Sequence, residues 1–467
     1  MAEYTALSER VEGQLLFDTH LDHSIPVDVI TRALSLQNEV GTEVPLSLDG
    51  FREFVMGEMD KDDDVECFLV LNTSEVVRKF QRWCTLFPEV KPFYAVKCYP
   101  NKVVIQLLSL LEGCGFDCAS QGEIEQVLQT GCSASRIIFA HPCKPVSSLK
   151  FALKNKVFTM TFDSEEELEK INNVIEAYDD QQKHEYREKI QLVLRLRVPD
   201  KNSDLPLGDK FGAVPEICPT LIHKAIELGL NLVGVSFHCG SGCHDSSSYQ
   251  NALELSKQVF GIAESAGLEL KILDIGGGFP GLDGSEDPTE ELSAQDIANC
   301  VNPFIRDHFL SNGHVKVIAE PGRYFVQSCQ RLVAEIYAKR ALKDGTFVYH
   351  IPEGVFGCFK DVLLVDEDFQ PIPLPRTSAD HQQHATEEND SNNVDENDPA
   401  PSCTYPSIIR GPTGVSKDLI TRSVQLPELE VGDLLYFNRF GAYTVSVASP
   451  ESSEVMRANV RYIFQSQ

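Results

Sequence analysis

Residues 92–113 read PFYAVKCYPNKVVIQLLSLLEG, and this stretch contains the unit from which the fold is built. Its first part, PFYAVK (92–97), is a short run of apolar and aromatic residues that is typical of a buried strand. A turn follows, and apolar residues then recur at helical spacing as far as Gly113, a residue that favours a helix C-terminus. The stretch therefore predicts a strand and then a helix, with a polar residue at the junction.

The same pattern recurs along the middle of the chain, where short strand-like runs end in a polar residue or a glycine and alternate with helical segments. Strand then helix, repeated eight times, predicts a parallel (β/α)8 barrel. A doubly wound open sheet is the alternative, and it is less favoured because polar residues follow nearly every run. The seven further runs are GFDCAS (115–120), RIIFAHP (136–142), VFTMTFDS (157–164), QLVLRLRVP (191–199), LVGVSFHCG (232–240), LKILDIGGG (270–278) and VKVIAEPG (315–322).

The two ends of the chain have a different character from the middle. Residues 1–72 mix helix and strand signals, and residues 324–467 are rich in strand-like runs. We expect both ends to build a second, mainly β domain beside a barrel formed by residues 73–323. Within the C-terminal part, residues 378–402 are polar, acidic and nearly free of large apolar side chains, which predicts a disordered surface insertion.

Composition excludes several classes of function. A net charge of −29 over 467 residues argues against nucleic acid and anionic membrane surfaces as partners. No signal peptide and no bilayer-spanning apolar run is present, so we expect a cytoplasmic protein with its 14 cysteines reduced. The pairs in CGFDC (114–118) and CGSGC (239–243) lack CxxC spacing, and His381 and His384 lie in the acidic insertion, so we expect no metal.

Lys97 is the last residue of the first strand-like run, PFYAVK. Strand alternation would place Phe93, Ala95 and Lys97 on one face. In a barrel the active site lies at the C-terminal ends of the strands, and a lysine there can act as a nucleophilic amine. A structural ion pair, or a lysine that extends its head to solvent, is the alternative interpretation of the same position.

Other strand-end residues complete a set of groups around such an amine. GGGFPG (276–281) lets backbone N–H groups approach a phosphate, although glycine runs also make plain turns. Arg323 can hold a phosphate dianion, and Glu320 can hold a protonated ring nitrogen. His238 offers a flat ring for stacking, and Ser241 offers a hydroxyl donor. Together these groups are what pyridoxal phosphate needs.

Many separate motifs, in one order, give the chain a family resemblance that runs from about residue 60 to the end, apart from the acidic insertion. The chain resembles eukaryotic ornithine decarboxylase and its paralogues, which implies a pyridoxal-phosphate barrel joined to a β domain. The resemblance also implies a head-to-tail homodimer with two shared active sites. The motifs are PFYAVKC, GFDCAS, the PCK of HPCKP, TFDSEEELEKI, KFGA, VGVSFHCGSGC, LDIGGGFPG, AEPGRYF, GPT and GAYTV.

The resemblance implies roles for individual residues around the cofactor. Lys97 would form the Schiff base, Glu320 would pair with the pyridine nitrogen, and His238 would stack on the ring. Lys210 and Asp418 match a pair that bridges the family's dimer interface. The expected phosphate-binding residues are Ser241, Gly276, Gly277, Gly278, Arg323 and Tyr443, and the expected polar network around the cofactor is Asp117, Glu123 and Arg195.

The substrate positions depart from the family pattern. Where ornithine decarboxylases have GPTCD, this chain has GPTGV, so Gly414 stands for the proton-donating Cys and Val415 for the Asp that binds the distal ammonium. Val365 occupies the place of a second acid for that ammonium, although Asp366 is adjacent, and Phe356 replaces a Tyr near the substrate.

Two valines in place of two carboxylates change the expected substrate. An ammonium buried without a partner is strongly disfavoured. An aliphatic side chain there would gain about 1.5–3 kcal/mol from burial. We therefore expect a decarboxylase of an apolar aliphatic amino acid, leucine best, that releases a primary amine and CO2.

Two other functions remain open. One is an ornithine or lysine decarboxylase of polyamine biosynthesis. The other is a non-catalytic protein like the family's antizyme inhibitors. Lys144, Lys150 and Lys154 lie in the family's antizyme-binding stretch, which makes antizyme a candidate partner, although an ordinary solvated helix face explains these lysines equally well.

Overall fold

The computed structural model describes residues 26–45, 47–61, 65–201, 203–282, 292–311, 313–374, 403–453 and 460–465. The acidic insertion 378–402, with His381 and His384, lies outside the described residues. The chain forms two compact units, a barrel unit with residues 28–38 and 76–326 and a β unit with residues 39–75 and 327–467.

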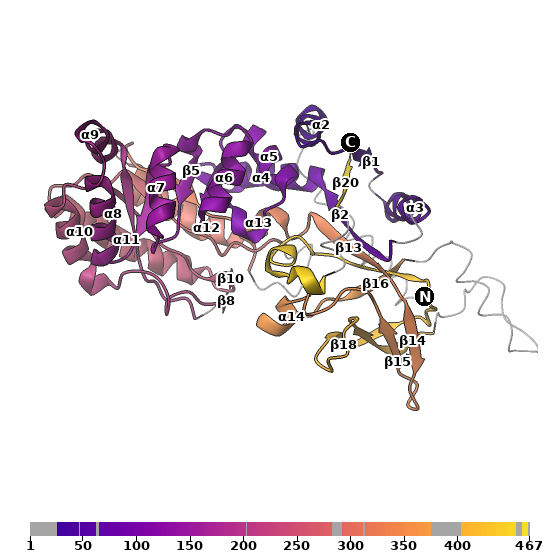
Figure 1. The fold of residues 1–467 in the computed structure, drawn as a ribbon. Helices are drawn as coiled ribbons and strands as arrows, with labels where there is room; N and C mark the ends of the chain where they lie inside the picture. Colours follow the sequence, from indigo (N-terminus) through magenta and orange to yellow (C-terminus); the bar gives the residue numbers. More distant parts are fainter. Residues whose placement is uncertain are drawn as a thin grey trace, which may run out of the picture. The chain divides into compact units, whose positions relative to one another are not determined.

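The barrel unit contains a closed sheet in which each predicted strand takes part (Figure 1). All of its neighbouring strands are parallel. This confirms the (β/α)8 barrel and rules out the doubly wound open sheet, since the sheet closes on itself. The order around the barrel is β11 (Ile272–Asp274), β12 (Lys316–Ala319), β3 (Val90–Ala95), β4 (Gly115–Cys118), β5 (Ile137–Phe139), β6 (Thr159–Phe162), β7 (Gln191–Arg195) and β9 (Leu232–Ser236).

Six of the barrel strands contribute side chains to one apolar core cluster, which contains Phe93, Ile138, Val193, Val233, Ile272 and Ile318. Because neighbouring strands are parallel, their C-terminal ends meet at one end of the barrel. The polar residues that follow each strand therefore converge at that end, while apolar packing supports them from below.

The helices of the barrel unit begin at identifiable caps. Asn101 accepts hydrogen bonds from Val103 N and Val104 N, and Ser293 forms a capping box with Asp296. The helical segments expected between the strand-like runs are therefore present. The helices are α4 (Thr73–Leu86), α5 (Lys102–Leu110), α6 (Gln121–Gln129), α7 (Val146–Lys154), α8 (Glu165–Glu176), α9 (Asp180–Lys189), α10 (Cys218–Glu227), α11 (Ser247–Ser265), α12 (Ala294–Ile305) and α13 (Arg323–Val326).

Shorter elements connect these helices and strands. A two-stranded antiparallel pair, β8 (Ser203–Leu205) with β10 (Ser241–Cys243), joins the segment after β7 to the segment after β9. The single turns are η1 (Val96–Cys98), η2 (Ala134–Arg136), η3 (Pro215–Ile217) and η4 (Arg306–Leu310).

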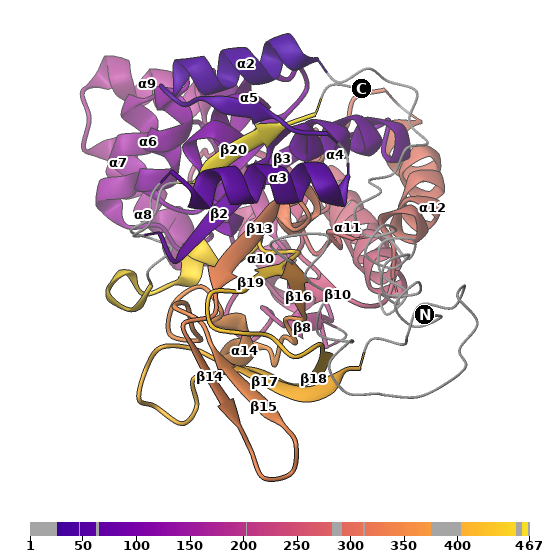
Figure 2. The same ribbon diagram turned by 90° about the vertical axis from the view of Figure 1, so that its right-hand side faces the viewer.

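The β unit draws its strands from both parts of the chain, which confirms the predicted second, mainly β domain. In its six-stranded sheet, β20 pairs in parallel with both β1 and β2, and β2 pairs antiparallel with β13 (Figure 2). The sheet order is β1 (Gly41–Glu43), β20 (Arg461–Phe464), β2 (Cys67–Asn72), β13 (Gln330–Glu335), β19 (Leu434–Phe437) and β16 (Pro371–Leu374).

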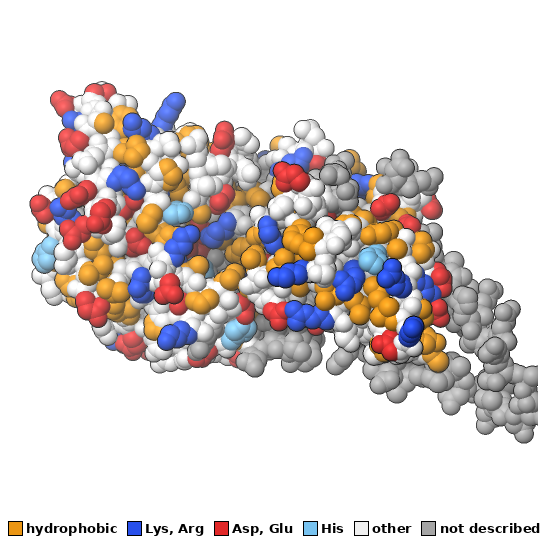
Figure 3. All heavy atoms as spheres, turned by 60° about the horizontal axis from the view of Figure 1, so that its bottom comes forward, with side chains coloured by type: hydrophobic (Ala, Val, Ile, Leu, Met, Phe, Trp, Pro, Cys, Tyr) orange, Lys and Arg blue, Asp and Glu red, His pale blue; other side chains and the backbone are white. Residues whose placement is uncertain are grey.

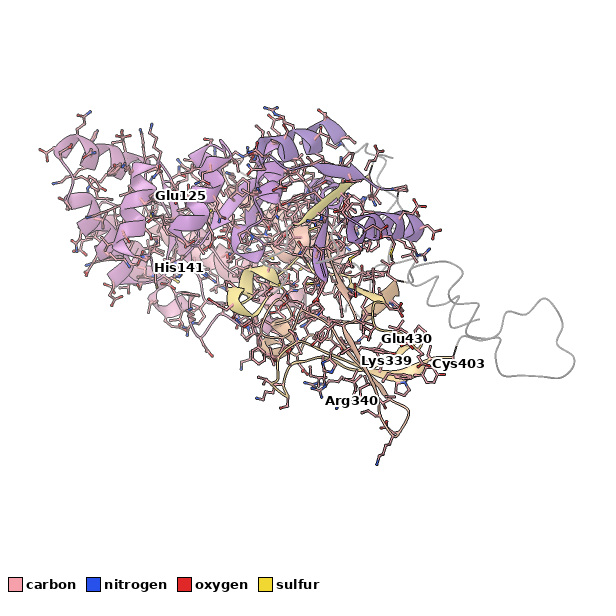
Figure 4. The ribbon with its side chains drawn as sticks, turned by 45° about the vertical axis from the view of Figure 1, so that its right-hand side comes forward. Glu125, His141, Lys339, Arg340, Cys403 and Glu430 are labelled. Atoms are coloured by element: carbon pink, nitrogen blue, oxygen red, sulfur yellow. The ribbon has the colours of Figure 1, made fainter. Side chains whose placement is uncertain are left out.

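A second sheet of the β unit contains four strands in the order β14 (Ala338–Ala341), β15 (Phe347–His350), β17 (Tyr405–Arg410) and β18 (Leu419–Leu426). The Lys339 ammonium on β14 donates 2.6 Å hydrogen bonds to the carboxylates of both Glu428 and Glu430 (Figure 4). The remaining elements of this unit are α3 (Leu48–Met59), α14 (Asp361–Leu364), η5 (Val445–Val447) and η6 (Pro450–Ser452).

Helix α2 (Val27–Leu36) corrects the expected domain boundaries. The sequence interpretation assigned all of residues 1–72 to the β domain, but residues 28–38 cluster with the barrel unit. The physical reason is local: the helix buries Ile30 and Leu34, and Gln37 Nε2 donates a 2.9 Å hydrogen bond to Gln106 Oε1 on α5.

Three further observations complete the description of the fold. None of the 14 cysteines, all of which lie in the described ranges, forms a disulfide bond. Across the described ranges, no helix is long and apolar enough to cross a membrane. Among the same residues, no group of three His, Cys, Asp or Glu side chains has the geometry of a metal site.

Candidate active site

Lys97 lies at the C-terminal end of the barrel, but it does not continue the strand. Strand β3 ends at Ala95, and Lys97 lies in the turn η1. The strand alternation expected for Phe93, Ala95 and Lys97 therefore ends at Ala95. Tyr94 Oη donates a 2.9 Å hydrogen bond to Tyr99 O, which holds the chain in a turn. The Lys97 ammonium forms an ion pair with Asp117 on the neighbouring strand β4.

Asp117 and Glu123 form the acidic side of the site next to Lys97. Asp117 is fully buried on β4, and its Oδ1 has no hydrogen-bond partner among the described residues. Glu123 accepts a hydrogen bond from Ala119 N at 2.8 Å, and Ser120 caps the same helix start by accepting from Glu123 N. Burial raises the pKa of Glu123 above its usual value, an effect that the Ala119 N–H partly offsets.

The glycine run after β11 forms a tight turn against the neighbouring strand ends. Gly276 has a φ of +64°, and a Cβ on it would lie 2.0 Å from Phe237 O. A Cβ on Gly277 would lie 2.8 Å from both Glu320 O and His238 Nε2. Side chains cannot occupy these positions, so the backbone of the turn can approach an anion closely, as a phosphate cradle requires. The N–H of Gly276 itself donates a 2.9 Å hydrogen bond to Asp274 Oδ1.

We expect Gly276→Ala to lower the free energy of unfolding by about 2–4 kcal/mol, because alanine would meet both left-handed strain and a backbone clash. Gly261→Ala is the matched control, since Gly261 lies in α11 with no atom within 4 Å of the added Cβ. That change should stabilise the helix by up to about 1 kcal/mol. Thermal melting of both variants checks this, and equal melting temperatures would contradict it.

His238 faces the same turn from the segment after β9. Its Nδ1 accepts a 3.0 Å hydrogen bond from Gly240 N, so the neutral ring carries its proton on Nε2. Burial, and then the positive charges of Arg195 and Lys97, lower the pKa of His238 well below its usual value. The ring is therefore neutral at physiological pH and suited to stacking on a flat aromatic group.

Arg195 stands at the end of β7, between two sides of the site. Its guanidinium lies 5.2 Å from the ring centroid of Phe211, a cation–π contact that fixes its position. Its charge also lowers the pKa values of Glu320 and Asp274, which follow or end the strands β12 and β11.

Glu320 follows β12 and is 8% exposed. Burial raises its pKa well above the usual value, and the neighbouring carboxyls of Asp274 and Asp117 raise it further. Asp274, at the end of β11, is fully buried, and burial raises its pKa to about 7. The two acids are close enough to interact, so they favour holding a proton between them.

The expected phosphate ligands come from three segments of the barrel unit and one of the β unit. Ser241 lies in β10, Gly278 follows β11 with a φ of +99°, and Arg323 begins α13. Tyr443 belongs to the β unit, where it is half-buried with a φ of +54°, so its expected contact with the phosphate stays a prediction.

The arrangement fits a phosphorylated, nitrogen-containing aromatic aldehyde. It offers an amine beside a carboxylate, a glycine turn for the phosphate, a neutral ring for stacking and a buried acid for a ring nitrogen. Buried polar atoms on three of the barrel strands also lack a hydrogen-bond partner among the described residues, as expected where a polar ligand belongs. They are Asp117 Oδ1, Ser236 Oγ and Asp274 Oδ2.

The sequence interpretation missed two titratable residues of this end of the barrel, Asp274 and His141. His141 follows β5 and is half-buried, with its ring edge-to-face on Phe211 at 5.4 Å between centroids (Figure 4). Burial, and then Lys144, Lys210 and Arg195, lower its pKa. The signal was available, because both residues stand where predicted strands end in polar residues.

The substrate-pocket candidates lie in the β unit. Val415 is 49% exposed, Gly414 is exposed, and Val365 and Phe356 are partly buried. Asp366, which could have restored an acid next to Val365, has a φ of +55° and forms a 3.0 Å ion pair with Arg422. Its carboxylate therefore already has a cationic partner.

Asp418 is buried in the loop that carries Gly414 and Val415. Its carboxylate accepts hydrogen bonds from Val355 N at 3.0 Å, Thr413 N at 2.9 Å and Thr413 Oγ1 at 2.7 Å. The residue thus folds its own loop, whereas Lys210 in the barrel unit is exposed. A pairing of Lys210 with Asp418 of a second copy stays a prediction.

Lys144 corrects another expectation. Its side chain is 0% exposed, pairs with Glu167 at 2.9 Å and donates to Thr161 O at 2.5 Å. It therefore cannot serve as a surface contact for antizyme. Lys150 and Lys154 are exposed on α7 and keep that role as a prediction.

A (β/α)8 barrel with this set of groups at its C-terminal end defines a pyridoxal-phosphate enzyme, and comparisons with known proteins agree. The family model described as "Pyridoxal-dependent decarboxylase, pyridoxal binding domain" matches residues 73–327. Antizyme inhibitor 2 of Xenopus laevis is 37% identical over 408 residues, 85% of this chain and 81% of that protein. Ornithine decarboxylase of Mus musculus is 35% identical over 421 residues, 87% of this chain and 83% of that protein.

A solved structure is also similar. The arginine decarboxylase of Paramecium bursaria Chlorella virus superposes with a TM-score of 0.72 at 32% identity, covering 88% of this chain and 99% of that one. The chain belongs to the eukaryotic ornithine decarboxylase family of pyridoxal-dependent decarboxylases, as a divergent paralogue. Its cofactor is pyridoxal 5′-phosphate, and its reaction class is decarboxylation.

Proposed function

We propose that this decarboxylase acts on an apolar aliphatic amino acid, with leucine the best size match, and releases isopentylamine and CO2. The observation that carries the proposal is the pair Val365 and Val415 at the positions where the family has acids for a distal ammonium. The ion pair of Asp366 with Arg422 supports the proposal, because the carboxylate next to Val365 already pairs with a cation of the protein.

The roles of the barrel residues follow the site geometry. Bound pyridoxal phosphate supplies an electron sink for the bond electrons that remain when CO2 leaves. Lys97 is the amine that would bind the cofactor covalently, and Asp117 holds that amine by its ion pair. His238 would stack on the cofactor ring, and Glu320 would hold its nitrogen.

Further residues would hold the phosphate or support the side chains that contact the cofactor. The positive charge of Arg195 offsets the negative charge of the buried acids. Glu123 holds the start of α6 in place beside Asp117. The phosphate is held by Ser241, Gly276, Gly277, Gly278, Arg323 and Tyr443.

Gly414 removes the proton-donating side chain that the family has at this position. The proton that replaces CO2 on the substrate carbon then has to come from Lys97 or from water. Both sources are less precisely placed than a loop thiol, so we expect slower turnover than in relatives that keep the thiol.

The pocket preference follows from two opposing free-energy terms. A buried ammonium without a partner costs several kcal/mol, which disfavours ornithine and lysine. An aliphatic side chain gains about 1.5–3 kcal/mol in the same place. Because Val415 is 49% exposed on its own chain, we also propose that a second copy covers it in a cytoplasmic homodimer.

The test is a substrate panel with purified protein and added pyridoxal phosphate. Leucine, valine, methionine, ornithine, lysine and arginine are incubated separately, and the released amines are quantified by mass spectrometry. Isopentylamine without putrescine or cadaverine is the expected result. Putrescine or cadaverine would show that an acid still binds the distal ammonium, and would replace this proposal by the ornithine or lysine decarboxylase alternative.

A second candidate function is antizyme binding, which the similarity to antizyme inhibitor 2 favours. Lys150 and Lys154 on α7 are exposed and available for an acidic partner surface. Absence of every amine, together with failure to bind the cofactor and co-purification with antizyme, would favour this function over catalysis.

A further inference from the structure

The short strand β8 packs closely on the segment that carries Ser241. This segment contains β10, which pairs antiparallel with β8 (Figure 1). A Cβ on Gly240 would collide with Ser203 Oγ. A Cβ on Gly242 would collide with the Asp204 carboxylate. Glycine at both positions therefore lets β8 approach the backbone before and after Ser241.

The same segment also contacts the glycine turn after β11. Cys243 N donates a 3.4 Å hydrogen bond to Gly278 O. A Cβ on Gly278 would lie 2.6 Å from Gly240 O, so the two backbones meet with no room for a side chain. The segment that carries Ser241 is therefore held both by β8 and by the turn expected to bind the phosphate.

Asp200 holds β8 in its place. Among the described strands β8 pairs with β10 alone, so its position depends on the loop around it. Asp200 is 8% exposed, and its carboxylate accepts hydrogen bonds from Leu207 N and, at 2.7 Å, from Gly208 N. Its backbone oxygen accepts a 2.7 Å hydrogen bond from Ser203 Oγ at the start of β8. One buried residue thus binds the chain on both sides of this strand.

A second polar contact near β8 lies at the surface. His244 Nε2 and Asp204 Oδ1 are 2.7 Å apart, but the two side chains are 51% and 41% exposed. Exposed pairs of this kind contribute little to stability, because water solvates both groups when they separate. We therefore expect Asp200, rather than this pair, to decide where β8 lies.

We propose that Asp200 is a positioning residue for the cofactor phosphate. It holds β8 against β10, which places the Ser241 hydroxyl beside the glycine turn. The inference rests on the phosphate-binding role proposed above for Ser241. Asp200 acts through β8, so it needs no contact of its own with the cofactor.

The test compares pyridoxal phosphate with pyridoxal, which has the same ring and aldehyde but no phosphate. Each apoprotein is titrated with both compounds in the absence of amino acid, and the dissociation constant of pyridoxal divided by that of pyridoxal phosphate measures what the phosphate contributes. We expect Asp200→Ala to lower this ratio at least about tenfold, because only the binding of pyridoxal phosphate weakens. Ser241→Ala should lower the ratio by a similar factor.

Two further variants serve as matched controls. Asp200→Asn keeps an oxygen that can accept from Leu207 N and Gly208 N, so its ratio should stay within about threefold of wild type. Asp209 is an exposed acid of the same loop, and Asp209→Asn should bind both compounds as wild type does.

The double variant of Asp200→Ala with Ser241→Ala tests whether Asp200 acts through Ser241. If it does, the ratio should fall no further than in Ser241→Ala alone. Independent effects of the two residues would multiply instead, and would overturn this route.

Melting temperatures of the apoproteins report whether each variant is folded. If Asp200→Ala does not fold, Ser203→Ala provides a milder change, because it removes only the hydrogen bond to the backbone oxygen of Asp200. It should lower the same ratio by about threefold, and an unchanged ratio would contradict the proposal.

Distinct results separate this inference from the function on which it rests. An unchanged ratio in Asp200→Ala with a lowered ratio in Ser241→Ala would overturn the role of Asp200 alone. An unchanged ratio in Ser241→Ala would overturn the role of Ser241 and this inference with it. Equal loss of affinity for both compounds in Asp200→Ala would mean that the loop only supports the fold. Because no amino acid is present, these results are independent of which amino acid is decarboxylated.

Discussion

Lys97→Ala is expected to lower kcat/KM by roughly 10³-fold or more, because no other amine stands at the end of β3 to bind the cofactor covalently. Lys97→Arg should fail equally, although it keeps the charge opposite Asp117. Borohydride reduction followed by mass spectrometry should find cofactor attached to the wild-type chain and to neither variant.

Lys91→Ala is the matched control, since Lys91 is an exposed lysine of the same strand. It should retain both the attached cofactor and the activity. If Lys97→Arg kept wild-type activity, Lys97 would serve only as an ion-pair partner of Asp117, and the assigned chemistry would be wrong.

The double substitution Val365→Asp with Val415→Asp is expected to reverse the substrate preference. Two carboxylates would supply partners for a distal ammonium and would remove the apolar surface that favours leucine. We expect leucine turnover to fall by about 10²-fold, with putrescine formation appearing when ornithine is supplied. The ratio of kcat/KM for the two amino acids is the quantity to measure.

Val431→Asp provides the control for the added charge. Val431 is 57% exposed in the same β unit, comparable to Val415 at 49%. The control should leave the substrate ratio unchanged. A double variant that still preferred leucine would show that Val365 and Val415 do not line the substrate pocket. Figure 3 shows one face of the molecule, on which hydrophobic side chains lie among lysines and arginines.

The fold could be predicted from the sequence because each barrel strand carries its own local signal. A short apolar run that ends in a polar residue, followed by helical spacing, occurs eight times in order, and short connections leave few ways to arrange such units. The cofactor-site residues could be predicted for the same reason, since parallel strands bring their C-terminal ends together whatever the details of each loop.

What could not be predicted depends on contacts between distant residues. Lys144 looks like a surface lysine at a helix start, and only its pairing with Glu167 shows that it turns inward. Asp418 looks like an available acid until the N–H groups of Val355 and Thr413 surround it.

Asp274 stands where a predicted strand ends, but the sequence does not show that its carboxyl interacts with Glu320. Glu320 follows the neighbouring strand β12, 46 positions further along the chain. Sequence patterns report local geometry, whereas these pairings depend on how strands close around the barrel axis.

The position of β20 has a consequence for how the protein is made. Residues 461–464 lie between β1 and β2 in the six-stranded sheet, so strands from the first 72 residues remain without this neighbour until residues 461–464 have been synthesised. Residues 76–326 belong to the barrel unit and are synthesised well before that point. The barrel can therefore form while strands of the β unit still lack a neighbour, and such strand edges can pair with other chains.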